Sequence, residues 1–311
     1  MQKKRNTVLL ILLISLSLLT VLLFLLSTND SSDIDKSLFK VGEQNKIDRI
    51  ILASQKGKLE LTFDGSKWMI NQKHEADPQL VTVFFASLLQ VEPKRRITGL
   101  QEDSITNRLK KEGIRVMLWE DKNLEKEFTL VGNDQKTETY FQFDNDAPYF
   151  VTIPGYRVYV ASIFELTESE WRNKKVFNFN WQNFKRLKVN FSEHPNQGFT
   201  ISVANGLFGI EEVTVADTTK LSSYLESIFN LRAERILTEK EAVIYDSLLA
   251  TSPILDLVIE DISKKKFELK IFSSASKSAL VVATMNHDEP ILLQPSAVFN
   301  ILRKRDYFVF K

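Results

Sequence analysis

LELTFDGSKWMI at Leu59–Ile70 and FTISVANGLFGI at Phe199–Ile210 are the two stretches that determine the fold of this chain. In both stretches apolar and polar residues alternate, as in a strand with one face against a core. The dipeptides Asp64-Gly65 and Asn205-Gly206 interrupt the alternation. Glycine readily adopts the positive φ that a tight turn requires. Each stretch is therefore predicted to form a β-hairpin.

The two predicted hairpins belong to a longer internal repeat with a spacing of 140 residues. So many matches at one spacing indicate a duplication. The expected fold class is α+β, with two tandem copies of an antiparallel-sheet-plus-helix unit over residues 40–175 and 176–311. The matches are Leu59 and Phe199, Leu61 and Ile201, Phe63 and Val203, Trp68 and Phe208, Ile70 and Ile210, Ala76-Asp77 and Ala216-Asp217, Trp119-Glu120-Asp121 and Ile259-Glu260-Asp261, and, one residue out of step, Pro154 and Pro295.

Helix and strand signals complete the first copy. Asp77-Pro78 combines an N-cap acceptor with proline at the first helical position, and the helix is expected to end before Pro93. A shorter helix is expected at Ser104–Lys111 and another near Tyr159–Phe164. Further strands are expected at Arg115–Trp119, Glu127–Val131, Tyr140–Phe143 and Tyr149–Ile153.

An uncharged apolar run, Val8–Leu26, precedes the repeats. As a helix, its 19 residues are about as long as a bilayer's hydrocarbon core is thick. Basic residues remain on the cytoplasmic side, so Lys3–Arg5 places the residues after the run across the membrane. We expect a cytoplasmic stub and transmembrane helix over residues 1–27 and a polar spacer over residues 28–39. The anchor residues are Val8, Leu9, Leu10, Ile11, Leu12, Leu13, Ile14, Leu16, Leu18, Leu19, Val21, Leu22, Leu23, Phe24, Leu25 and Leu26.

Two other interpretations compete for this run. A cleaved signal peptide needs a shorter apolar segment and a cleavage site of small residues, and Leu25–Asp30 offers no good site of that kind. A helix that packs one side on a globular core has a polar face, which this run lacks, since it is apolar on every side. An uncleaved anchor fits both features.

Composition restricts the chemistry of the chain. The 41 basic and 40 acidic residues give a net charge of +1, which does not indicate a nucleic-acid partner. The absence of cysteine excludes disulfides, thiolate metal sites and thiol catalysis. His74, His194 and His287 lack the spacing of zinc ligands, and no nucleophile elbow or phosphate-binding loop is present. We expect no enzymatic activity, cofactor or metal.

Several charged motifs have two interpretations. Asp144-Asn145-Asp146 carries the oxygen ligands that calcium prefers, but these residue types also build turns, which we expect here. Glu120-Asp121 and Glu260-Asp261 resemble catalytic carboxylate pairs, but a repeated position is more simply a repeated turn. Solvated strand edges and helix ends, or contacts with anionic lipid or a partner, would explain the basic clusters at Lys94–Arg96, Lys264–Lys266 and Arg303–Arg305.

The connector WRNKKVFNFNW at Trp171–Trp181 is basic and aromatic. Its aromatic residues, with Phe184, pack between the two copies in one interpretation. In the other interpretation they form a partner-binding surface. The residues that would carry such a surface are Trp171, Arg172, Phe177 and Trp181.

Four of these features together resemble the bacterial DUF4340 family. They are the strand–DG–W hairpin at Leu59–Ile70, the helix start at Ala76–Pro78, the YFVTIP strand at Tyr149–Pro154 and the connector at Trp171–Phe177. The resemblance implies a membrane helix followed by a duplicated exported region. It also implies an accessory role beside ABC transporters, including those linked to gliding motility, and it supplies no catalytic residues.

The function expected is that of a non-enzymatic protein of the bacterial inner membrane, with its N-terminus cytoplasmic and its bulk periplasmic. Its partners would be the membrane and proteins of an envelope complex, such as ABC transporter subunits. The alternative is a ligand- or glycan-binding module that uses the cleft between the repeats. An envelope enzyme is the third hypothesis, against which the missing catalytic motifs argue.

Overall fold

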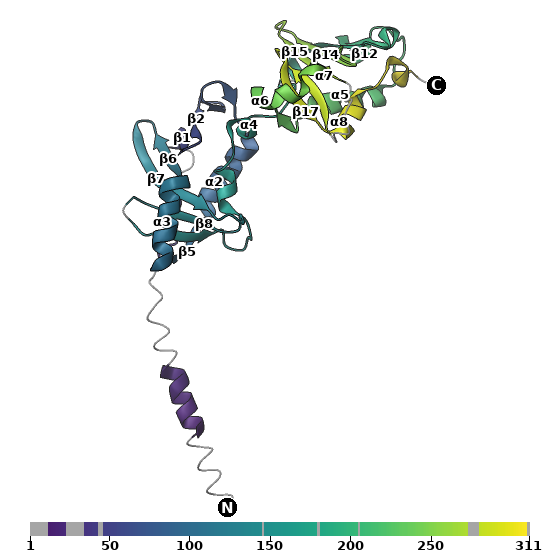
Figure 1. Cartoon of the computed structure of the whole chain (residues 1–311). Coiled ribbons are helices and arrows are strands. Elements are labelled where there is room, and N and C mark those ends of the chain that lie inside the picture. The colour runs from purple at the N-terminus through teal and green to yellow at the C-terminus, as the bar shows by residue number, and fades with distance from the viewer. Residues whose placement is uncertain are drawn as a thin grey trace, which may run out of the picture. The chain divides into compact units, whose positions relative to one another are not determined.

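A computed structural model of the chain describes residues 12–22, 34–42, 46–144, 146–178, 181–204, 206–272 and 280–309. These residues form two antiparallel sheets accompanied by helices (Figure 1), which confirms the α+β fold class. The first sheet contains β1 (Arg49–Ser54), β2 (Gly57–Phe63), β3 (Trp68–Ile70), β4 (His74–Glu75), β5 (Glu92–Arg96), β6 (Ile114–Glu120), β7 (Asn123–Gly132), β8 (Thr139–Gln142) and β9 (Tyr149–Thr152). The second contains β10 (Phe184–Phe191), β11 (Phe199–Ala204), β12 (Leu207–Ile210), β13 (Arg235–Ile236), β14 (Leu255–Asp261), β15 (Lys266–Ile271), β16 (Val281–Met285) and β17 (Glu289–Leu293).

The two sheets have the same strand order once β4 is set aside. The first runs β4-β3-β2-β1-β6-β7-β8-β9-β5, and the second runs β12-β11-β10-β14-β15-β16-β17-β13. In each sheet a short strand from the middle of the copy (β5 or β13) returns to pair with the last strand, β9 or β17. This shared order supports the duplication inferred from the sequence.

Helices connect the strands. The α-helices are α2 (Pro78–Gln90), α3 (Leu100–Glu112), α4 (Glu168–Trp171), α5 (Thr218–Phe229), α6 (Glu239–Ala242), α7 (Asp246–Leu249) and α8 (Pro295–Ile301). The 3₁₀ helices are η3 (Val160–Ile163), η4 (Trp181–Asn183), η5 (Pro195–Gln197), η6 (Val243–Tyr245) and η7 (Arg305–Phe308). Asp77 caps α2 by accepting a hydrogen bond from the backbone N–H of Gln79 at 2.9 Å, and Asp217 caps α5 in the same way.

The hairpins have the predicted register. Leu61 pairs with Ile70 in the first sheet, and Ile201 pairs with Ile210 in the second. Gly65 turns the first hairpin with a φ of 97°. The spacing of 140 residues therefore relates equivalent positions in both hairpins.

The match expected between Trp119 and Ile259 is wrong by one residue. Trp119 lies opposite Arg49 in the first sheet, and in the second sheet Glu260 lies opposite Arg186. The structural equivalent of Trp119 is therefore Glu260. Ile259 is fully buried on the inner face instead, because connecting segments of different length shift the spacing beyond the hairpins.

Each sheet encloses its own core on its inner face. In the first, the rings of Phe39 and Phe141 have centroids 5.2 Å apart, and both side chains are fully buried. Phe39 thus belongs to the folded part, although the polar spacer was expected to extend to it. Helix α3 covers one end of the outer face, where Leu109 packs on Val131 and Tyr140.

The chain divides into two compact units. The first comprises residues 1–60 and 82–165, and the second comprises residues 61–81 and 166–311. The boundary expected between residues 175 and 176 stays a prediction.

Residues 12–22 form a helix whose large apolar side chains are exposed, for example Leu13 at 65% and Leu18 at 67%. The remaining anchor residues, Val8–Ile11 and Leu23–Leu26, lie outside the described residues. No helix in the described ranges is both long and apolar enough to cross a membrane.

Candidate functional site

The rings of Trp171 and Phe177 lie in the interior, each with an exposed fraction of 0%. Phe177 belongs to the core of the second sheet. Burial of these large apolar rings stabilises the fold and removes them from the surface. The structure thus corrects the expectation of a partner surface for these two residues and favours core packing. Trp181 begins η4, and its side chain lies outside the description.

Arg172 is also held within the second unit. Its guanidinium donates two hydrogen bonds to the carboxylate of Glu289, with N···O distances of 2.5 and 2.9 Å. The side chain of Arg172 is only 15% exposed. A two-pronged pair of this kind fixes orientation as well as charge. Arg172 therefore forms an internal ion pair that connects two segments of the second unit; we call such an internal polar contact a tie.

Two carboxylates next to this tie fix other parts of the second unit. Asp77 is 5% exposed and accepts a hydrogen bond from Arg232 in addition to its cap of α2. Burial raises the pKa of Glu75, but hydrogen bonds from Asn173, Lys67 and Asn178 outweigh burial, so this pKa lies below its ordinary value. Both carboxylates are thus partnered, which is typical of structural contacts.

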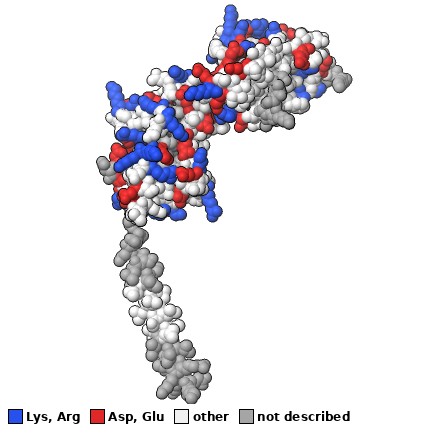
Figure 2. Space-filling model, viewed as in Figure 1, with Lys and Arg blue, Asp and Glu red and all other residues white. Residues whose placement is uncertain are grey.

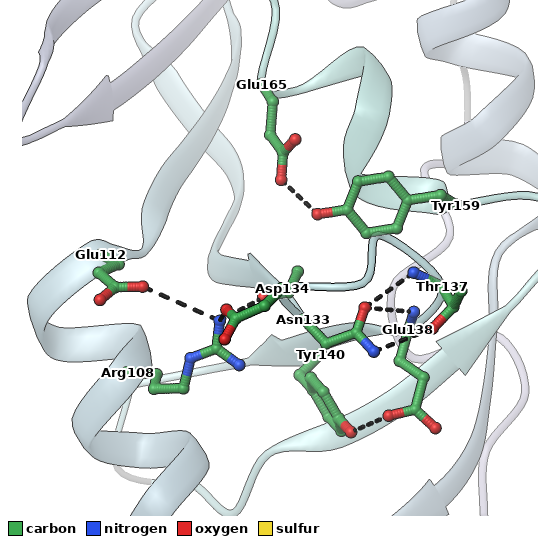
Figure 3. A network of polar contacts seen from close by, with 10 residues as sticks. Arg108, Glu112, Asn133, Asp134, Thr137, Glu138, Tyr140, Tyr159 and Glu165 are labelled. Carbon is green, nitrogen blue, oxygen red and sulfur yellow. Dashed lines mark hydrogen bonds and ion pairs between the residues drawn. The ribbon is translucent and has the colours of Figure 1, made fainter.

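A second polar network joins α3 to the end of β7 in the first unit (Figure 3). Arg108 donates to the carbonyl oxygen of Gly132 and to the carboxylate of Asp134, each at 2.9 Å. The side-chain oxygen of Asn133 accepts from the backbone N–H groups of Thr137 and Glu138 at 2.8 and 2.9 Å. These bonds close the turn between β7 and β8 and hold α3 against it.

Two tyrosines belong to the same network, and both are hydrogen-bonded to glutamates. Burial and the nearby Glu138 carboxylate raise the pKa of Tyr140 to about 12. Burial and Glu165 likewise raise the pKa of Tyr159. Both phenols are therefore protonated donors at neutral pH, which does not suit a nucleophile or general base. A Cβ on Gly132 would lie 1.5 Å from the Tyr159 hydroxyl oxygen, so the network requires glycine there.

The outer face of the first sheet carries an apolar patch where α3 does not cover it, beside the Arg115–Glu127 ion pair. We call Arg49, Ile51, Met117, Trp119 and Leu124 the Arg49 face; all lie on β1, β6 or β7 of the first unit. The Arg49 guanidinium stacks 4.5 Å from the centroid of the Trp119 ring. Nε of Arg49 and Nε1 of Trp119 are buried and have no hydrogen-bond partner in the described structure.

The second sheet carries charges at the equivalent positions. Arg186 donates to the Glu260 carboxylate from Nε at 3.1 Å and from Nη2 at 2.8 Å, and Lys185 donates to the same carboxylate at 2.7 Å. These hydrogen bonds hold the pKa of Glu260 below its ordinary value. Figure 2 shows that acidic and basic side chains are interspersed on the visible face of both folded parts.

The motifs singled out for chemistry lie at turns. Asp121 lies in the turn after β6, as expected, whereas Glu120, Glu260 and Asp261 are the last residues of β6 and β14 and lie beside the turns. Asp146 accepts from Arg96 at 3.0 Å, and Asn145 lies outside the described residues. In the part of the chain that the structure describes, no group of His, Asp and Glu side chains is suited to hold a metal ion.

The fold thus defines an α+β protein with two antiparallel sheets of one strand order. The chain belongs to the DUF4340 family, whose domain is described as one of unknown function and which matches residues 68–247. No curated protein and no solved structure matches the chain. The sequence resemblance to this family is therefore confirmed.

Proposed function

We propose that the chain is a non-enzymatic accessory protein, anchored by Val8–Leu26 in the bacterial inner membrane, with its folded part in the periplasm. It would bind partner proteins of an envelope complex, such as an ABC-type transporter or a gliding-motility assembly. The two sheets would be tandem copies of one scaffold, and the anchor would raise the concentration of that scaffold near its partners.

Exposure of the helix at residues 12–22 carries the proposal. Leu12, Leu16 and Leu19 are 61%, 59% and 53% exposed, and the helix bears no charge. Burial of a leucine side chain stabilises by roughly 1.5–3 kcal/mol, so exposing such a helix to water is unfavourable. A bilayer would cover it on every side.

Partner binding is supported by what the described polar clusters do. Arg172, Asp77, Glu75 and Arg108 are all engaged in internal ties. The Arg49 face, by contrast, combines apolar side chains with donors that have no acceptor among the described residues. Contacts of that kind suit protein association better than chemistry.

The absence of cysteine permits a sharp test of the anchor and its orientation. Lys240→Cys and Lys4→Cys each create one labelling site. In intact spheroplasts an impermeant maleimide should label position 240 and not position 4, and the chain should resist carbonate extraction. Leu16→Arg with Leu19→Arg is the matched control that should be extracted. Extraction of the wild-type chain would overturn the anchor, and labelling of position 4 would overturn its orientation.

Partner binding is tested by purification from mild detergent after cross-linking in cells. The same envelope protein should accompany the wild-type chain in repeated preparations and be absent with the Leu16→Arg, Leu19→Arg control. Recovery of the wild-type chain alone would contradict the proposed function.

A further inference from the structure

We propose that the Arg49 face is the surface that binds the protein partner, and that the partner places an aspartate or glutamate carboxylate there from an apolar segment. This inference rests on the proposed function, because it assigns the site through which the accessory protein holds its complex. Neither buried aromatic residues of the connector nor the polar networks offer a comparable free surface.

The register places these residues on one face. Arg49 pairs with Trp119 and Ile51 with Met117 across β1 and β6, and Leu124 of β7 pairs with Trp119. Residues two apart on a strand point to the same side of the sheet. Ile51 is 7% exposed at the centre and Leu124 is 43% exposed. Tryptophan, methionine and arginine are the residue types enriched in protein interfaces.

The donors on this face indicate an acceptor from outside. Nε of Arg49 and Nε1 of Trp119 are buried without an acceptor in the described structure. Buried N–H groups are almost always paired in proteins. A carboxylate has two acceptor oxygens and a negative charge, so it would pair with the terminal guanidinium nitrogens of Arg49, which are not among the buried unpaired atoms, and neutralise the arginine beside the two buried donors.

The second sheet shows what the first sheet lacks. Its equivalent arginine, Arg186, is paired with the Glu260 carboxylate directly across the strands. In the first sheet the arginine is present, but Trp119 stands where that glutamate would be. The first sheet thus has a cation stacked on an aromatic ring where the second sheet has a cation paired with an internal carboxylate. Charge complementarity therefore points to an acidic side chain of a protein partner.

Photo-cross-linking of the full chain in its native membrane tests this surface. The probe is p-benzoylphenylalanine introduced at Leu124, and mass spectrometry identifies the cross-linked peptide. We expect one protein adduct whose peptide contains Asp or Glu beside apolar residues. Arg49→Gln should lower the adduct yield about tenfold, as loss of an interface anchor does. Arg186→Gln, the matched control, should leave it unchanged.

A charge swap completes the test. Replacement of the partner's acidic residue by arginine should abolish the adduct with the wild-type chain, and Arg49→Glu should restore it. An adduct with a second copy of this chain, adducts with lipid alone, or a yield that ignores Arg49 would each overturn the assignment. If the partner co-purifies equally well with the Arg49→Gln chain, this surface is wrong while the accessory function stands. If no partner accompanies the wild-type chain, the function itself fails.

Discussion

The two sheets have one strand order, but their outer faces differ in chemistry at equivalent positions of the central strands. Positions that hold Ile51 and Trp119 in the first sheet hold Lys188 and Glu260 in the second. The inner faces do not differ in this way at the paired positions of β1 with β6 and of β10 with β14, because Ile50, Val116, Leu118, Leu187, Leu257 and Ile259 are all fully buried and apolar. Core packing fixes the inner positions, whereas the outer positions are free to become an interface or a solvated surface.

If the two sheets are equivalent, one buried aromatic residue should hold the start of the capped helix in each, Trp171 for α2 and Phe308 for α5. The carbonyl oxygens of Trp171 and Phe308 accept from the cap residues Asp77 and Asp217, each at 2.8 Å. Both side chains are fully buried. Trp171→Ala and Phe308→Ala should each lower the free energy of unfolding by about 3–5 kcal/mol in urea titrations.

Tyr156→Ala is the control, because Tyr156 is 65% exposed. It should change the free energy of unfolding by less than about 0.5 kcal/mol. If either Trp171→Ala or Phe308→Ala lowered the free energy of unfolding by less than about 1 kcal/mol, the two aromatic residues would not have equivalent roles.

Substitutions at two glycines, Gly132 and Gly209, compare a closely packed position with an open one. Gly132→Ala places its Cβ against Tyr159 and should break the Tyr159–Glu165 hydrogen bond. We expect Gly132→Ala to lower the free energy of unfolding by about 1–3 kcal/mol, as for other overpacked sites. Gly209→Ala in β12 meets nothing within 4 Å and should be nearly neutral. Equal effects in thermal unfolding would contradict the close approach at Gly132.

The charged outer face should respond to pH where the apolar one does not. The folded-state pKa of Glu260 is lowered by Lys185 and Arg186, so its stabilising contribution is present above the ordinary glutamate pKa of about 4.3. That contribution is lost as pH falls through the lower folded-state pKa. The difference in thermal unfolding midpoint between wild type and Glu260→Gln should therefore be constant near neutral pH and should disappear in acid.

Trp119→Gln at the equivalent position is the control for this titration. It removes no charge, so its difference from wild type should stay the same across the pH range. A difference for Glu260→Gln that does not vary with pH would argue against the ion pair as the source of stability.

The smallest effect is expected at Asp256. Burial raises the pKa of Asp256, and its Oδ1 is buried with no hydrogen-bond partner among the residues that the structure describes. Its equivalent in the first sheet is Arg115. Asp256→Asn should stabilise the protein at neutral pH by up to ~1 kcal/mol. The gain should shrink as pH falls, because the wild-type carboxyl is protonated at a higher pH than an ordinary aspartate.

Thermal unfolding of Asp256→Asn and wild type at several pH values measures the stability gain and its dependence on pH. Glu193→Gln is the control at an exposed carboxylate and should show neither effect. Destabilisation by Asp256→Asn at neutral pH would contradict an unfavourable burial of the charge.

Local patterns predicted the hairpins and the starts of α2 and α5, since alternation, turn glycines and capping aspartates act over a few residues. The strands β1, β5, β10 and β13 were not predicted. β5 reads EPKRR, which is polar and contains proline, and it becomes a strand only because β9 offers an edge to pair with. Such pairing over some 50 residues leaves no local signal.

The candidate site was less predictable than the fold. The sequence favoured core packing for the connector aromatics and left a partner surface as the alternative, and the burial of Trp171 and Phe177 agrees with core packing. Arg49 and Trp119 are 70 residues apart in sequence. Only the pairing of β1 with β6 brings the guanidinium over the indole, where both N–H groups have no acceptor within the described part of the chain.

By itself the sequence determined an apolar N-terminal run, a repeated hairpin-and-helix unit and a family, because these depend on composition and on contacts between near neighbours. Tertiary structure alone decided which side of each sheet meets the core and which residues face each other across strands. It did so because a shift of one residue in a β-strand moves every side chain to the opposite face. That shift makes Glu260, and not Ile259, the counterpart of Trp119.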